Sequence, residues 1–202
     1  MEITDRLIAG WTTGPLAPLK PWQVTAAASA QVRKLLQRLP SGYYCRDEVA
    51  IHETATVEAG AVIKGPAIIG PRSFIAASAY LRDGCWLEES CILGPGAELK
   101  SSFLFAGTKL AHFNFVGDSI LGHQVNLEAG AIIANYRNEW PNPTITFFHE
   151  GARIATGVMK FGAVVGDETR IGANAVIAPG AILEAGTRVP RLALIDQSTP
   201  LR

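Results

Sequence analysis

The chain has 202 residues, 48% of them hydrophobic, and a formal net charge of +0 at pH 7. This length and apolar content suit one domain with a sizeable core. The balanced charge argues against binding of nucleic acid or a membrane surface through bulk charge. No stretch reaches the roughly 18 apolar residues of a membrane-spanning helix, and the start MEITDRLIAGW is unlike a signal peptide. We therefore expect a cytoplasmic protein whose three cysteines are reduced thiols.

Residues 1–49 carry no repeat and are rich in proline. Pro21 suits the first turn of a helix, and Pro40 suits the segment after its end. The residues between them include an apolar stripe formed by Val32, Leu35, Leu36 and Leu39. Because a solenoid exposes its first coil, we predict a helix here that caps this end of the repeat that follows.

From Ile51 onwards, large apolar residues recur at every sixth position. The series runs Ile51, Val57, Ile63, Ile69, Ile75, Leu81, Leu87, Leu93, Leu99 and Phe105. It returns as Phe115, Leu121, Leu127 and Ile133, and again as Met159, Val165, Ile171, Ile177, Leu183 and Val189. Most early members are followed, four positions later, by a small residue, and Cys85 and Cys91 occupy this position. A period of six is typical of an all-β fold, the parallel β-helix, in which three hexads form an 18-residue coil.

Two breaks interrupt the repeat, at 106–114 and at 134–158. Because a regular coil has no internal room for extra residues, we expect both breaks to project outward, where functional residues tend to lie. The predicted organisation is a proline-rich segment with a helical cap over 1–49, a β-helix over 50–190 and a C-terminal tail over 191–202. The alternative for the repeat is an ordinary sandwich of short strands.

Arg82 and Lys100 each follow an inward aliphatic residue and are one full coil apart. They should therefore stand side by side on one face of the β-helix. Like charges in neighbouring strands are unfavourable, and a bridging anion such as a phosphate would reverse that. The alternative is a pair of flexible surface cations that bend apart.

The segment from Tyr80 to Tyr136 contains the stretches YLRDG, ELKSS, HFNFVGDSILGHQVNLEAGA and ANY. It resembles the acetyltransferase domain of the bacterial bifunctional glucosamine-1-phosphate N-acetyltransferase and UDP-N-acetylglucosamine pyrophosphorylase. It also resembles that domain's stand-alone hexapeptide-repeat relatives, in which KFGAVVGD and IGANAVIAPG have counterparts. The resemblance implies a left-handed β-helix that N-acetylates an amino sugar phosphate or a nucleotide sugar. It further implies acetyl-CoA as the donor and a homotrimer, the alternative being a monomer.

The resemblance implies a role for each matched residue. His112 would be the general base that takes a proton from the sugar amine. Glu98 lies near this face of the predicted coil and is a candidate to orient His112. The backbone N–H of Ala129 would face the thioester oxygen. The residues that would bind the acceptor are Arg82, Lys100, Phe115 and Asn126, and those that would contact acetyl-CoA are Asn135 and Tyr136. Acyl transfer from a thioester requires no metal.

Three positions depart from the family pattern. Phe115 stands where the family usually has tyrosine, so one hydroxyl contact is lost. The family follows its Asn-Tyr with Asp-Gly and a substrate-binding lysine, whereas this chain continues with Arg137 and RNEWP. Arg137 is a candidate replacement for that lysine. Glu128 replaces a glycine and could crowd the path of the pantetheine arm. These changes permit a different acceptor or a loss of activity.

Other functions stay open on the sequence alone. A sugar-phosphate-binding or assembly domain without turnover would keep the cations and lose the chemistry. An O-acyltransferase of the lipid A type would need an apolar channel for a long acyl chain. A zinc carbonic anhydrase of hexapeptide fold would need three converging histidines, a requirement that the spacing of the four histidines does not favour. These are His52, His112, His123 and His149.

Overall fold

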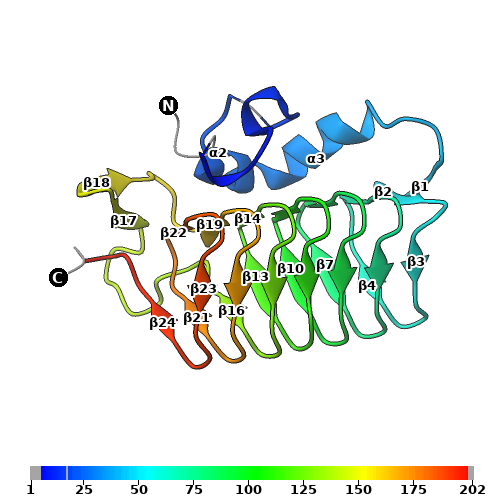
Figure 1. Cartoon of the computed structure of the whole chain (residues 1–202). Coiled ribbons are helices and arrows are strands. Elements are labelled where there is room, and N and C mark those ends of the chain that lie inside the picture. Colours follow the sequence, from blue (N-terminus) through cyan, green and yellow to red (C-terminus); the bar gives the residue numbers. More distant parts are fainter. Residues whose placement is uncertain (1–5, 17, 200–202) are drawn as a thin grey trace.

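The computed structural model describes residues 6–16 and 18–199 and is a left-handed parallel β-helix, as the hexad repeat and the family resemblance predicted (Figure 1). The first five residues of the stretch that we compared with a signal peptide lie outside the described residues, as do residues 17 and 200–202. Of the helices that the structure describes, none is long and apolar enough to cross a membrane.

Three sheets form the sides of the coils, and all their strand pairs are parallel except β1 with β2. Sheet A contains β1 (Tyr43–Arg46), β2 (Val49–His52), β5 (Ala67–Ile69), β8 (Cys85–Leu87), β11 (Phe103–Leu104), β14 (Ile120–Leu121), β19 (Ala163–Val165) and β22 (Ala181–Leu183). Sheet B contains β3 (Thr56–Val57), β6 (Phe74–Ile75), β9 (Ile92–Leu93), β12 (Lys109–Leu110), β15 (Asn126–Leu127), β20 (Arg170–Ile171) and β23 (Arg188–Val189). Sheet C contains β4 (Val62–Ile63), β7 (Tyr80–Arg82), β10 (Glu98–Lys100), β13 (Phe115–Gly117), β16 (Ile132–Ile133), β21 (Val176–Ile177) and β24 (Leu194–Ile195).

The inward apolar residues of successive coils stack in a column that holds the coils together. At two points along the chain, the spacing between successive inward residues departs from six. Leu104, not Phe105, pairs with Leu87, and Val116, not Phe115, pairs with Leu99. Leu87 and Leu104 are therefore 17 residues apart, one fewer than three hexads. Because strand side chains alternate between faces, the two phenylalanines point outward instead. The prediction that Phe105 and Phe115 belong to the inward series is thus wrong.

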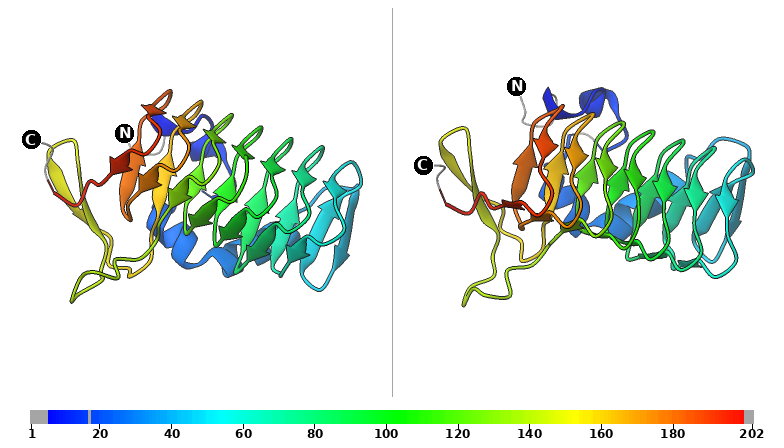
Figure 2. Two further views of the ribbon diagram at one scale, coloured as in Figure 1. Left: turned by 90° about the horizontal axis from the view of Figure 1, so that it is seen from below. Right: turned by 60° about the horizontal axis from the view of Figure 1, so that its bottom comes forward.

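The shortened coils also remove the first predicted break. Residues 106–114 do not project as an excursion, because β12 lies within them and pairs with β9 and β15 in register. Counting in sixes had created an apparent surplus of four residues. Residues 134–158 do leave the coils and form a hairpin of β17 (Thr146–His149) and β18 (Ala152–Ala155) (Figure 2). Met159, predicted to restart the inward series, is 61% exposed, and Val165 restarts it.

The N-terminal helices lie along the outer face of sheet A rather than over the exposed first coil of the β-helix (Figure 1). They follow the 3-10 turn η1 (Trp11–Thr13) and are α2 (Pro21–Ala26) and α3 (Ala28–Leu36). The predicted cap over the first coil is therefore wrong. The outward side chains of sheet A are apolar, and they form one buried cluster with the helices; those side chains include Ile68, Phe103, Ile120, Val164 and Ile182. Burial of this cluster explains why the helices cover this face.

The outer boundaries of the β-helix also differ from the sequence-based ones. β1 lies within 1–49 and pairs antiparallel with β2, so it extends sheet A beyond its first coil. β24 lies within 191–202 and pairs with β21, so the coils continue past residue 190. Gly84 has a φ of 96°, and a Cβ there would lie 2.5 Å from the backbone nitrogen of Ser29. This glycine therefore lets the start of α3 rest directly against the coil.

Candidate functional site

Arg82 and Lys100 lie side by side on the outer face of sheet C. The two residues are register partners in β7 and β10, and their neighbours Leu81 and Leu99 are fully buried inside the coil. The predicted adjacency of the two cations is therefore confirmed. Lys100 is only 8% exposed, so its charge requires a partner close by.

Carboxylates of the chain itself balance these two cations. Arg82 donates to Glu98 Oε1 and to Asp83 Oδ2, at 2.8 Å each. Lys100 Nζ donates to the two oxygens of Asp118 at 3.0 and 3.2 Å. Partial burial lowers the pKa of Arg82, but the hydrogen bond and charge of Glu98 outweigh it and raise that pKa above its usual value. Glu98 thus bonds Arg82 rather than His112.

A hollow of about 460 Å³ opens on sheet C, and we call it the wall hollow. Its lining residues are Arg82, Lys100, Phe115, Asn135, Tyr136 and Lys160. Five of these are residues that the sequence singled out, and the structure brings them together. Lys160 is the residue that sequence reasoning missed. Its signal was its place in KFGAVVGD, directly before the repeat resumes.

Asp118 connects the two groups of predicted ligands. It is 4% exposed, and besides Lys100 it accepts a hydrogen bond from Asn135 Nδ2. It directly follows Gly117 at the corner after β13, in a left-handed backbone conformation with a φ of 46°. Asp118 therefore fixes both an acceptor candidate and an acetyl-CoA candidate, although the sequence argument had assigned it no role.

His112 lies at the corner between β12 and β13, and its side chain is exposed. Its carbonyl accepts a hydrogen bond from the N–H of Gly130 at 2.9 Å, so its neighbour in the next coil is Ala129. Within the described residues the imidazole makes no hydrogen bond. The ring is thus free to meet a substrate, at the edge of sheet C opposite to the edge where Lys100 lies.

A row of backbone N–H groups faces outward along this corner, and glutamates cap some of them. The N–H of Ala77 donates to Glu58 at 2.8 Å, and the N–H of Ala173 donates to Glu128 at 2.9 Å. In each case the glutamate sits in the preceding coil, at the first position of the same corner.

The N–H of Ala129 has no such cap. The residue in the equivalent position of the preceding coil is Ala111, whose side chain has no acceptor atom. Across residues 6–16 and 18–199, no acceptor takes a hydrogen bond from this N–H. A backbone donor beside an exposed imidazole is the arrangement that an oxyanion site needs.

Asn126 lies on another side of the coil. It belongs to β15 of sheet B, between Lys109 and Arg170, and it lines a separate hollow of about 240 Å³. Within one chain the structure therefore does not bring Asn126 into the wall hollow. His112 and Ala129, at the corner, are also absent from its lining.

The sequence of the chain is similar to part of two longer proteins. A bifunctional sugar-1-phosphate nucleotidylyltransferase/acetyltransferase of Sulfurisphaera tokodaii is 32% identical over 183 residues, covering 88% of this chain and 45% of that protein. The bifunctional protein GlmU of Methanococcus vannielii is 30% identical over 184 residues, covering 88% and 43%. The chain spans less than half the length of these relatives. No family model matches it.

Together with the β-helix, these similarities confirm the predicted resemblance to the acetyltransferase part of such bifunctional proteins. A solved protein of Bacillus cereus, proposed to be an acetyltransferase, is 14% identical with a TM-score of 0.50. The match covers 74% of this chain and 82% of that protein, and it supports the fold alone.

Two departures from the pattern of this hexapeptide-repeat domain have structural explanations. Glu128 receives two hydrogen bonds from Arg191, both at 2.8 Å, and the pair runs along the corner that Ala129 occupies, toward the later coils. The hydrogen bonds from Arg191 lower the pKa of Glu128 below its usual value. Arg137, the candidate replacement for the family lysine, is 3% exposed and turns away from the wall hollow.

Arg137 ties the start of the excursion to the C-terminal strand. It donates to the two carboxylate oxygens of Asp196 at 2.7 and 2.9 Å and to the carbonyl of Pro179 at 3.0 Å. Its guanidinium also lies 4.6 Å from the ring centre of Trp140. The hydrogen bond from Arg137 holds the pKa of Asp196 well below its ordinary range. This anchor fixes the chain directly after Tyr136.

Replacing Asp196 with asparagine should lower the free energy of unfolding at pH 7 by about 1–3 kcal/mol. A carboxyl whose pKa is lower in the folded state stabilises the fold above its unfolded pKa, and this stabilisation disappears as the pH falls. The difference between the two proteins should therefore shrink below about pH 4. Urea unfolding at pH 7, 4 and 3 measures it, with the exposed Asp47→Asn as control. A difference that stays constant with pH would contradict the assignment.

The four histidines do not converge. His123 lies beside Asp167, with Nδ1 3.2 Å from Oδ1, and His52 packs edge-on against Tyr43. In the part of the chain that the structure describes, no three His, Cys, Asp or Glu side chains come close enough together to hold a metal ion. The arrangement of histidines expected of a zinc carbonic anhydrase is thus not found there.

Proposed function

We propose that the protein transfers an acyl group from acetyl-CoA to the amine of a phosphorylated amino sugar or of a nucleotide sugar. One observation carries this proposal. The wall hollow is lined by three cations, Arg82, Lys100 and Lys160, and none of its described lining residues is acidic. Such a hollow suits a phosphate, and the exposed imidazole of His112 lies at the other edge of the same sheet.

In the proposed reaction, neutral His112 takes a proton from the sugar amine while the amine nitrogen attacks the thioester carbonyl carbon. The uncapped N–H of Ala129 donates to the oxyanion that forms. The carbon–sulfur bond then breaks, and the CoA thiolate leaves with the proton. The products are the N-acetylated sugar and free CoA.

We further propose that the site is completed between copies in a homotrimer. Sheet A is covered by the chain's own helices, whereas sheet C leaves apolar side chains exposed, at 47% for Val62, 37% for Ile132 and 66% for Leu194. A threefold assembly can place sheet B of one copy against sheet C of the next. Asn126 and His112 of one copy would then face the wall hollow of another.

The test is release of free thiol from acetyl-CoA, screened over amino sugar 1-phosphates and nucleotide-linked amino sugars, with sedimentation to give the number of subunits. Thiol release that requires an amino sugar supports the proposal. Binding of a phosphorylated sugar with no thiol release would favour a second function, a sugar-phosphate-binding domain. The Glu128–Arg191 pair favours this second function, because it places a carboxylate and a guanidinium at the corner that Ala129 occupies.

Replacing Ala111 with glutamate should cap the N–H of Ala129 and lower kcat by about 10²-fold, the usual effect of removing one oxyanion donor. Glu58 and Glu128 already cap the corresponding N–H groups elsewhere along this corner. The control is Ala111→Met, which adds similar bulk without an acceptor. Steady-state thiol release measures both variants. Equal loss in the two would show that bulk, and not capping, is responsible.

A further inference from the structure

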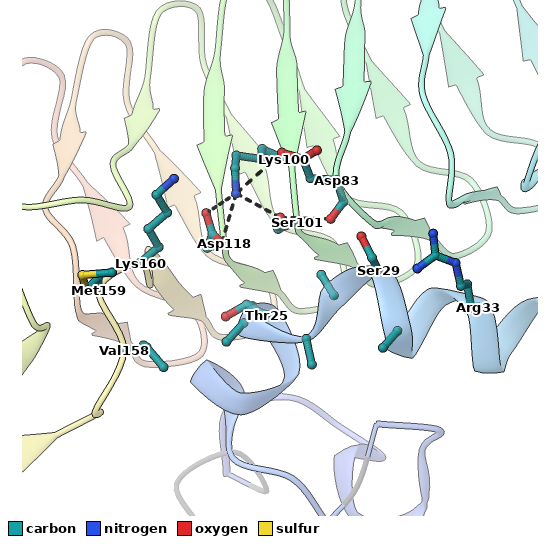
Figure 3. Close-up of a pocket in the computed structure, with 14 residues that line it drawn as sticks. Thr25, Ser29, Arg33, Asp83, Lys100, Ser101, Asp118, Val158, Met159 and Lys160 are labelled. Atoms are coloured by element: carbon teal, nitrogen blue, oxygen red, sulfur yellow. Dashed lines mark hydrogen bonds and ion pairs between the residues drawn. The ribbon is translucent and has the colours of Figure 1, made fainter.

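A second hollow, of about 620 Å³, adjoins the wall hollow, and we call it the helix hollow (Figure 3). It lies between the α2–α3 helices and the corners that follow strands of sheet C. Lys100 and Lys160 line both hollows, so the two meet at this pair of lysines. Lys100 is held at the junction by Asp118 and by the hydroxyl of Ser101, 3.0 Å from Nζ.

The two hollows differ in chemistry. The helix hollow is walled on one side by small residues over 26–30 and on the other by Val158 and Met159. Two carboxylates also line it, the exposed Asp83 and the buried Asp118, whereas no carboxylate lines the wall hollow. The wall hollow therefore suits an anion. The helix hollow suits an uncharged group that has a broad apolar surface and hydroxyls to donate.

We propose that the helix hollow binds the nucleoside of a nucleotide-linked amino sugar, whose diphosphate lies at Lys100 and Lys160. This inference rests on the proposed function and selects its acceptor, a nucleotide sugar in preference to a sugar 1-phosphate. The volume lies within the range of small-molecule sites. The small residues of the helices leave space for a base, and Asp83 is placed to accept a hydrogen bond from a ribose hydroxyl, a contact that carboxylates make in nucleotide sites.

The guanidinium of Arg33 does not change this assignment. Arg33 lines the helix hollow, but its guanidinium is held by Glu48 through hydrogen bonds of 2.6 and 2.8 Å. A further phosphate would therefore meet an arginine that is already paired, and it would also approach Asp83 and Asp118. At the junction, Lys160 makes no hydrogen bond or ion pair within the part of the chain that the structure describes, and the carboxylate of Asp83 lies beyond it in the helix hollow. This arrangement matches the order diphosphate, then nucleoside.

Calorimetric titration of the full chain with UDP, GDP, dTDP and CDP tests the site without catalysis. At least one should bind, and Ala30→Phe or Ala26→Phe should weaken its binding at least tenfold, because both exposed alanines line the helix hollow. Lys34→Phe, on α3 outside the lining, is the matched control and should bind normally. The inference is overturned if no diphosphate binds, if the three variants behave alike, or if the alanine variants lose acetyl-CoA binding instead.

A kinetic arm separates this inference from the proposed function. With a nucleotide-linked amino sugar, Ala30→Phe should raise KM at least tenfold, while KM for an amino sugar 1-phosphate stays unchanged. If no acceptor releases thiol but nucleoside diphosphate binding is lost in Ala30→Phe, the nucleoside site stands and the proposed function fails. If Ala30→Phe changes KM for neither acceptor, the function stands and the nucleoside site fails.

Discussion

Replacing His112 with asparagine should lower kcat by about 10²–10⁴-fold, the contribution of a general base, with KM for the acceptor changed only slightly. The imidazole is exposed and makes no hydrogen bond to the described part of the chain, so its loss removes the proton acceptor without disturbing the coil. Steady-state thiol release from acetyl-CoA measures the effect.

His52→Asn is the matched control, since it removes an imidazole in the first coil of the β-helix, beside Tyr43. It should leave kcat within about twofold. A His112→Asn protein that keeps its kcat, or that loses activity only through a higher KM, would show that His112 is not the base. A His112→Asn protein that unfolds at lower denaturant would instead indicate a structural role.

Replacing Asp118 with alanine should lower the free energy of unfolding by about 3–5 kcal/mol, as expected when one partner of a buried ion pair is removed. Lys100 would keep its charge at 8% exposure with its nearest counter-charge gone. The amide of Asn135 would also lose its acceptor. Urea denaturation followed by circular dichroism measures the loss.

The double variant Asp118→Leu with Lys100→Met separates charge from packing. It removes both members of the pair, so the part of the loss that comes from the uncompensated charge of Lys100 should return, because replacing a buried ion pair by apolar side chains is often neutral. Binding of a phosphorylated sugar should be lost in this double variant, since Lys100 is gone. A single Asp118→Ala change that costs less than about 1 kcal/mol would contradict the role of Asp118 as the main partner of Lys100.

The location of the proposed chemistry depends on which residues share a corner. Ala129 follows His112 in the coil stack, and both lie between sheets B and C. Phe115 is three residues after His112 and lines the wall hollow, whereas Arg82 and Lys100 lie at the far edge of sheet C in the two preceding coils. This distance across sheet C is why a contribution from a second copy is part of the proposal.

The sequence by itself determined the β-helix and the placement of Arg82 beside Lys100. Both follow from a repeat whose period equals the length of one side of the coil, so residues one coil apart must become neighbours. It also indicated that Cys85 and Cys91 fill small inward positions. There burial raises the pKa of each thiol to about 12.

The tertiary structure alone decided the register after Leu99. A one-residue deletion is invisible in the sequence when both candidates for the inward position are apolar, as with Leu104 and Phe105, and only strand pairing selects one. It also decided that Lys160, which follows the long excursion, lines the wall hollow, and that the N-terminal helices cover sheet A. Such contacts join residues far apart in the chain, and they depend on which surfaces remain unburied once the coils have stacked.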